Sequence, residues 1–130
     1  MKKNKFMIRI LTISLFIICL ILYYNYTQHT NLLKRYAKAI EYYETWPEEE
    51  KIPDVGYIAD ADEAIEMAEK VIESVASKET SVLMRPYYVE FDKRNKVYFV
   101  YNNPEGYIVG HVRIIFNKED GKILAIWFIV

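Results

Sequence analysis

With 130 residues the chain has room for one domain of ordinary size, and 52% hydrophobic with 27% charged residues is a globular composition. Four of the 17 basic residues and none of the 18 acidic residues lie within residues 1–24, so residues 25–130 carry a net charge of −5. Because nucleic-acid binding needs a basic surface that releases phosphate counterions, this charge excludes nucleic acid as an expected partner and permits a basic protein.

The N-terminal segment has the pattern of a single membrane-spanning helix. A basic tail, residues 1–5, precedes an apolar run over residues 6–24 in which Arg9 is the one charged side chain. Crossing the hydrocarbon core takes about 20 mostly apolar residues, so this run is predicted to be a transmembrane helix. Because basic flanks stay on the cytoplasmic side, the tail is expected in the cytoplasm and residues 25–130 outside the cytoplasmic membrane, in a single-pass arrangement.

A cleaved signal peptide is the alternative interpretation of the same segment, and it would release the rest of the chain as a secreted protein. Signal cleavage needs small residues at the cut, whereas Leu22–Tyr26 reads Leu-Tyr-Tyr-Asn-Tyr with no Ala-x-Ala pattern. Interfacial tyrosines favour a retained anchor. Cys19 follows Ile18 rather than a small residue, which disfavours a lipoprotein, and as the only cysteine it forms no intramolecular disulfide.

Residues 30–45 are predicted to form a helix between the anchor and the domain. Its apolar positions recur at spacings of three and four, and Trp46 and Pro47 end it. A polar connector follows, so residues 25–51 are assigned to a helical stalk or connector. The apolar stripe is broad, which favours docking onto a sheet over a free stalk. The stripe consists of Leu32, Leu33, Tyr36, Ala37, Ile40 and Tyr43.

A second helix is predicted to begin after Asp60. Asp60 supplies a carboxylate N-cap and Glu63 stands at the third helical position, a variant of the capping box that satisfies backbone N–H groups at the helix start. These acids and Asp62 lack the glycine and the distal bidentate acid of a calcium loop, so capping is the better interpretation. The apolar face of this helix consists of Ala64, Ile65, Ala68, Val71, Ile72 and Val75.

From Leu83 onward the apolar period changes to two, which is typical of strands. Strands are predicted over residues 84–91, 96–102, 107–117 and 122–129. The separators are short and rich in Asn, Asp and Gly, so neighbouring strands are expected to be antiparallel. The predicted class is α+β, with helices packed on a four-stranded antiparallel sheet.

The two faces of the last strands differ in their expected surroundings. In the third strand the positions expected to face the core are Ile108, Gly110, Val112, Ile114 and Phe116. The positions expected to face away are Val109, His111, Arg113 and Ile115. The last strand is apolar on both faces, so its second face is either covered by the first helix after the anchor or open as a binding patch.

Short motifs occur in a fixed order between about Ile52 and Trp127. They are Ala64-Ile-Glu-Met-Ala-Glu69, Arg85-Pro-Tyr87, a strand, turn and strand, Gly110 before an apolar strand, and Asp120-Gly-Lys-Ile-Leu124. In this order they resemble the immunity proteins of bacterial polymorphic toxin systems with a shortened nuclear transport factor 2-like fold. The resemblance implies such a domain over residues 52–130. Structural-motif positions, the helix cap included, are then Asp60, Glu63, Arg85, Pro86, Gly110, Asp120 and Gly121.

The resemblance implies a membrane-anchored bacterial immunity protein that binds a cognate toxin and neutralises it by occlusion. A helix followed by hairpins that end in Asp120-Gly-Lys-Ile also resembles the PepSY domain, an extracytoplasmic module associated with peptidase inhibition. The alternative function is therefore a PepSY-like inhibitor or accessory module of an envelope peptidase. Under either function the expected partner is a protein.

No residue pattern favours catalysis. The two histidines, His29 and His111, have no sequence-local carboxylate or thiol that completes a triad or a metal set. With four glycines there is no glycine-rich phosphate loop. The chain is therefore expected not to be an enzyme and to carry neither a cofactor nor a metal.

The tyrosines favour binding instead. Twelve occur in 130 residues, and this side chain offers a large contact area at low entropic cost. The apolar last strand also leaves self-association through the sheet edge open. The candidate partner-binding residues are Tyr88, Tyr98, Tyr107, His111 and Arg113.

Overall fold

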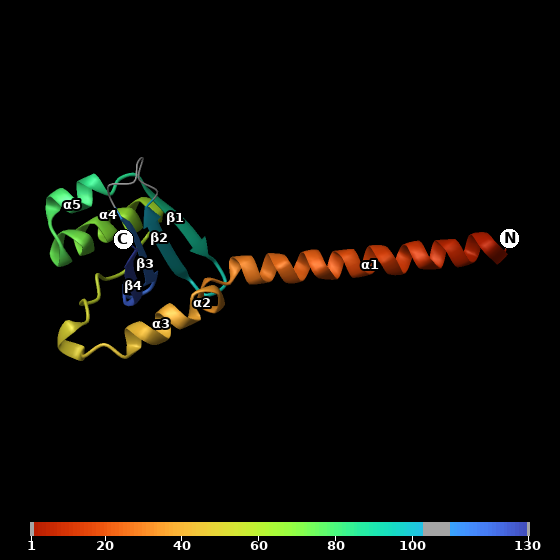
Figure 1. Cartoon of the computed structure of the whole chain (residues 1–130), viewed down its shortest axis with the longest axis horizontal. Coiled ribbons are helices and arrows are strands. Elements are labelled where there is room, and N and C mark those ends of the chain that lie inside the picture. Colours follow the sequence, from red (N-terminus) through yellow and green to blue (C-terminus); the bar gives the residue numbers. More distant parts are fainter. Residues whose placement is uncertain (1, 103–109, 130) are drawn as a thin grey trace.

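The computed structural model describes residues 2–102 and 110–129, in which a long helix, α1 (Lys2–Thr30), leads into an α+β domain (Figure 1). Over Lys2–Tyr26, α1 is long and apolar enough to cross a membrane, and the domain buries none of this stretch. At about 1.5 Å per residue its length exceeds the ~30 Å of a hydrocarbon core. The domain therefore leaves this stretch exposed, which suits contact with lipid.

The four strands form one antiparallel sheet in the order β1-β2-β3-β4, which confirms the predicted class. The strands are β1 (Tyr87–Asp92), β2 (Val97–Asn102), β3 (His111–Asn117) and β4 (Ile123–Ile129). The first strand begins later than predicted, because the Met84 N–H group still donates to the Thr80 carbonyl, 3.0 Å away, in a helical turn. Residues 107–109 of the predicted third strand lie outside the described residues.

Helix α4 (Ala61–Val75) packs on one face of the sheet, and α5 (Lys78–Leu83) packs against α4. The predicted cap of α4 is confirmed: the Glu63 N–H group donates to Asp60 Oδ1 at 2.8 Å, and the Ala59 N–H group donates to Glu63 Oε2 at 2.8 Å. Helix α5 was not predicted, because it has only six residues and leaves Val82 and Leu83 exposed. It has no amphipathic period that a sequence pattern could reveal.

Helices α2 (Leu32–Arg35) and α3 (Ala37–Glu44) pack on the other face, so the predicted docking is confirmed. They are not the single helix predicted over residues 30–45. The helix is interrupted at Asn31, where the Leu32 N–H group donates to Asp92 Oδ2 at 2.9 Å. It is interrupted again at Tyr36, whose ring stacks on Phe99. The packed domain therefore includes residues assigned above to the connector, while the 3₁₀ turn η1 (Glu48–Glu50) remains an exposed link to α4.

Both faces of the sheet are buried over much of their area, because helices lie on each side. Val100, Ile114 and Phe116 face α4, and all are at most 1% exposed. Ile115, expected to point away from the core, does lie on the opposite face but is fully buried there. The second face of β4 is likewise covered in part, since α3 packs against this strand. A sheet with two covered faces explains why β4 is apolar throughout.

The segment before α4 is held against the turn between β3 and β4. The Val55 N–H group donates to the Gly121 carbonyl and the Gly56 N–H group to the Asp120 carbonyl, each at 3.1 Å. Ile58 donates to the Lys118 carbonyl at 2.9 Å and is fully buried. The predicted motif residues Asp120 and Gly121 thus act as the docking point for a segment about 60 residues earlier in the chain.

Candidate partner-binding face

One row of side chains crosses all four strands on the sheet face that α2 and α3 cover only in part. Tyr88 pairs with Tyr101, Tyr101 with Arg113, and Arg113 with Trp127 in the strand registers. His111 lies two residues before Arg113 and therefore on the same face. Tyr88 is 44% exposed, His111 is exposed, and the other three are half-buried. We call the five residues Tyr88, Tyr101, His111, Arg113 and Trp127 the open face.

The rings of the open face form a continuous stack with neighbouring rings on the same face that α2 and α3 cover. The Tyr88 and Tyr101 centroids are 5.7 Å apart, and Tyr101 lies 5.2 Å from Phe99, which is 4% exposed. Phe99 in turn stacks on Tyr36 at 4.6 Å and on Trp127 at 6.3 Å. Ring pairs at these separations attract one another beyond simple burial. The open face is therefore held in place by α2, α3 and the sheet in the free protein.

Cationic groups border these rings. The Arg113 guanidinium lies 5.9 Å from the Trp127 ring centre, and the Arg35 guanidinium lies 5.1 Å from that of Tyr36. Arg35 also forms an ion pair with Glu90 at 2.8 Å. A shallow hollow between α2 and β4 is lined by Arg113, Trp127 and the exposed lysines Lys34 and Lys38. The local charge is positive although the domain is acidic overall, so this face suits an acidic or hydrogen-bond-accepting surface.

The structure brings together three of the five candidate partner-binding residues, Tyr88, His111 and Arg113. Tyr98 lies on the opposite face and is 3% exposed, so it does not join them. Tyr107 lies outside the described residues. Sequence reasoning did not select Tyr101 and Trp127. Their signal lay in the strand registers, because Tyr101 opposes Tyr88 across the first hairpin and Trp127 opposes Arg113 across the third.

Tyr98 has a structural role that accounts for its burial. Its hydroxyl accepts a hydrogen bond from the Lys118 ammonium at 3.3 Å, and the same ammonium donates to the Ala59 carbonyl at 3.0 Å. The Lys118 nitrogen also lies 5.4–5.6 Å from the ring centres of Tyr57, Phe91 and Tyr98. The hydrogen bond to Tyr98 raises the pKa of Lys118 above its ordinary value. This aromatic cage fastens the start of α4 to the sheet.

The remaining motif residues also serve the frame of the fold. Arg85 forms a two-pronged ion pair with Glu69 of α4, at 2.7 and 3.0 Å, and Pro86 leads from there into β1. The Gly110 carbonyl accepts a hydrogen bond at 3.2 Å from the buried Asn102 side chain, which ties the start of β3 to the end of β2. These positions support the open face from behind and beside it.

The open face offers contact area and donors rather than an assembled reaction centre. Its one histidine, His111, is exposed beside a cation. Within residues 2–102 and 110–129, no group of three or more His, Cys, Asp or Glu side chains is placed to hold a metal ion. What the arrangement provides is a preordered surface of Tyr, Trp and Arg.

Comparison with protein-family models, with curated proteins and with solved structures finds no match to the chain.

Proposed function

We propose that the chain is a membrane-anchored immunity protein whose domain binds a cognate bacterial toxin and neutralises it by occlusion. The observation that carries this proposal is the row of Tyr88, Tyr101, Arg113 and Trp127 across four strands, which the helices leave partly exposed. Tyr, Trp and Arg are the residues that most often dominate the energetics of protein interfaces. The motif order from Ala64 to Leu124, which resembles such immunity proteins, supports the toxin as the class of partner.

Preorganisation of the open face supports binding without a large ordering cost. Side chains that must be immobilised on association each cost about 0.5–1.5 kcal/mol. Here Tyr101 and Trp127 already stack on the buried Phe99, and Arg113 already lies over Trp127. A partner that contacts these groups therefore meets a surface whose rotamers are largely fixed, which favours slow dissociation.

The proposed location is the cytoplasmic membrane, with the basic tail inside and the domain outside. The basic residues Lys2, Lys3, Lys5 and Arg9 support this orientation, and release after signal cleavage is the alternative. We expect an epitope placed after Val130 to be digested by protease added to intact spheroplasts, and the full-length mass to stay with the membrane fraction. Protection of the epitope would reverse the orientation, and a shortened chain in the medium would support cleavage.

The binding proposal is tested with the full chain and the toxin encoded beside its gene. We expect the two proteins to co-purify and co-expression to rescue cells from the toxin. Substituting Tyr88→Ala together with Arg113→Ala removes one exposed ring and one guanidinium from the open face. One hot-spot truncation costs about 2 kcal/mol or more, so if even one of the two residues is a hot spot the dissociation constant should rise at least ~30-fold.

The matched control is the pair Tyr42→Ala and Lys78→Ala, which removes one exposed ring and one exposed cation that are not part of the open face. It should leave affinity and rescue unchanged. Equal losses of affinity and rescue in both double variants would show that the open face is not part of the interface. Inhibition of a membrane peptidase without toxin rescue would replace the immunity proposal with the PepSY-like alternative.

A further inference from the structure

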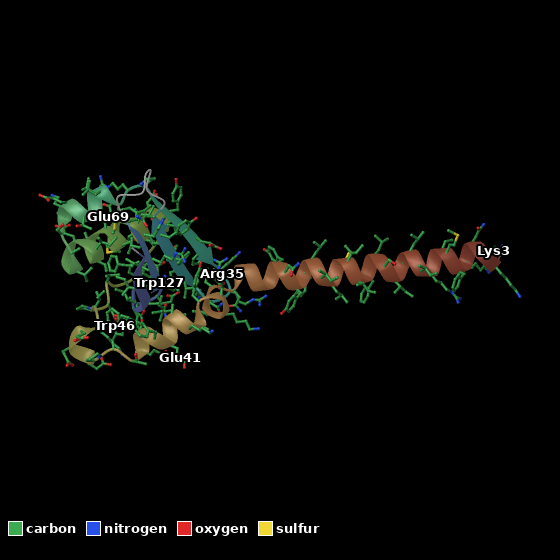
Figure 2. All side chains as sticks on the ribbon, viewed as in Figure 1. Lys3, Arg35, Glu41, Trp46, Glu69 and Trp127 are labelled. Carbon is green, nitrogen blue, oxygen red and sulfur yellow. The ribbon has the colours of Figure 1, made fainter. Side chains whose placement is uncertain are left out.

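The charges of the domain are segregated along the direction in which α1 leaves it. Residues 44–79 hold twelve acidic and three basic side chains. This segment forms the side of the domain away from α1, which includes η1, α4 and α5 (Figure 1). Glu69 lies on that side, whereas Arg35 lies where the domain meets α1 (Figure 2). The domain therefore has an acidic side far from the anchor and a basic end beside it.

Four exposed basic side chains lie at the anchor end, and we call them the basic collar. Lys34 and Lys38 are one turn apart at α2 and α3, and Lys93 and Arg94 form the turn between β1 and β2. None of the four makes an ion pair with a residue that the structure describes, whereas Lys96 of the same turn pairs with Glu119. The collar cations are thus available to an external anion.

The turn that carries Lys93 and Arg94 is fastened to the chain just beyond the anchor. The Asn95 side-chain amide donates to Asn31 Oδ1 at 3.1 Å, and Asp92 at the end of β1 accepts from the Leu32 N–H group at 2.9 Å. Asn31 follows by five residues Tyr26, where the stretch that can span a membrane ends. Five helical residues rise about 8 Å, which is about one Debye length at physiological salt. These contacts place the collar within reach of the headgroups.

We propose that the basic collar binds the anionic phosphate headgroups of membrane phospholipids and thereby holds the domain upright, with its acidic side away from the bilayer. The proposal rests on the anchoring part of the proposed function. Basic groups beside a membrane span are attracted to anionic lipid, and this attraction falls off within a Debye length. The position of the collar matches this range. Because Lys34 and Lys38 border the open face, headgroup binding also fixes the direction in which that face points.

The test uses the full chain reconstituted in vesicles of phosphatidylcholine alone or of phosphatidylcholine with phosphatidylglycerol. Lysines are acetylated sparsely with acetic anhydride and read by mass spectrometry. We expect Lys34, Lys38 and Lys93 to react about fivefold more slowly in the anionic vesicles, an effect that added salt reverses. Lys70 and Lys78 on the acidic side are internal controls, and their rates should be the same in both lipids.

A pair of charge-matched variants tests whether the collar acts as one surface. Lys93→Gln with Arg94→Gln should restore the acetylation of Lys34, whereas Lys70→Gln with Lys78→Gln should not. Equal acetylation rates for Lys34, Lys38 and Lys93 in the two lipids would overturn the proposal that the collar binds headgroups. Continued protection of Lys34 in the variant without Lys93 and Arg94 would overturn it as well. Flotation of the chain with both vesicle types reports anchoring separately. A chain that does not float would overturn anchoring itself, and neither readout depends on toxin binding.

Discussion

Gly121→Ala is expected to lower the free energy of unfolding of the domain by at least about 3 kcal/mol. Gly121 has a φ of +67°, a left-handed conformation that costs a residue with a Cβ about 1–2 kcal/mol. A Cβ there would also collide with the Gly56 backbone oxygen and nitrogen and lie 2.7 Å from Val55 Cγ2. Backbone hydrogen bonds from Val55 and Gly56 hold the two segments together, so neither can withdraw without losing them.

Gly56→Ala is the matched control, because it adds the same methyl group on the other side of this contact. Gly56 also has a positive φ, +89°, but an added Cβ meets nothing within 4 Å. Its cost should be limited to backbone strain, about 1–2 kcal/mol. Denaturant unfolding of the full chain in detergent, followed by fluorescence of Trp46 and Trp127, measures both variants. Equal destabilisation of the two would show that the close approach of the segments contributes nothing.

The sequence predicted those parts of the fold whose cause is local. The α4 cap depends on Asp60 and Glu63, three residues apart, and the antiparallel meander depends on short turns between strands of period two. The break in the helix at Asn31 has a non-local cause, because Leu32 donates to Asp92, 60 residues later in the chain. No periodicity in residues 30–45 contains that information.

The candidate site was predictable only in part. The alternation of side chains along a strand predicts which face of the sheet each residue lies on. His111 and Arg113 alternate with the core residues of β3, so their outward direction followed from the sequence. Tyr98 stands at a position of β2 opposite Phe116, which puts it on the core face, and assigning it requires the register between strands. The contribution of Tyr36 and Phe99 beside the open face depends on how α2 and α3 cross the sheet, which is tertiary packing.

Asp92→Asn is expected to destabilise the domain by about 3 kcal/mol and to loosen α2 from the sheet. The Asp92 carboxylate is 3% exposed and accepts hydrogen bonds from the Leu32 and Arg94 N–H groups at 2.9 and 3.0 Å. It also accepts from the Asn95 side-chain amide at 2.8 Å and the Asn95 N–H group at 3.2 Å. The NH₂ group of an asparagine at this position would face the N–H groups that now donate to the carboxylate. Hydrogen bonds to a charged group contribute about 1.5–3 kcal/mol each.

The destabilisation caused by Asp92→Asn should be lost at acidic pH. Burial alone would raise the pKa of Asp92, but the hydrogen bonds from the Asn95 side chain and from the Asn95, Leu32 and Arg94 N–H groups outweigh burial, so the pKa is lowered. A carboxyl whose folded-state pKa lies below its unfolded value of about 3.9 stabilises the fold fully above that pH and loses this contribution as the pH falls through the folded pKa.

We therefore expect the stability difference between the native chain and Asp92→Asn to be constant near neutral pH and to shrink below about pH 4. Unfolding by denaturant across this range measures it. Asp60→Asn is the control, because asparagine is as good an N-cap as aspartate and the site is exposed, so that variant should remain near native stability. A difference that grows on acidification would contradict the charged hydrogen-bonded state of Asp92. In that case the link between α2 and the β1–β2 turn, on which the position of the basic collar depends, would have to be held by Asn31 and Asn95 instead.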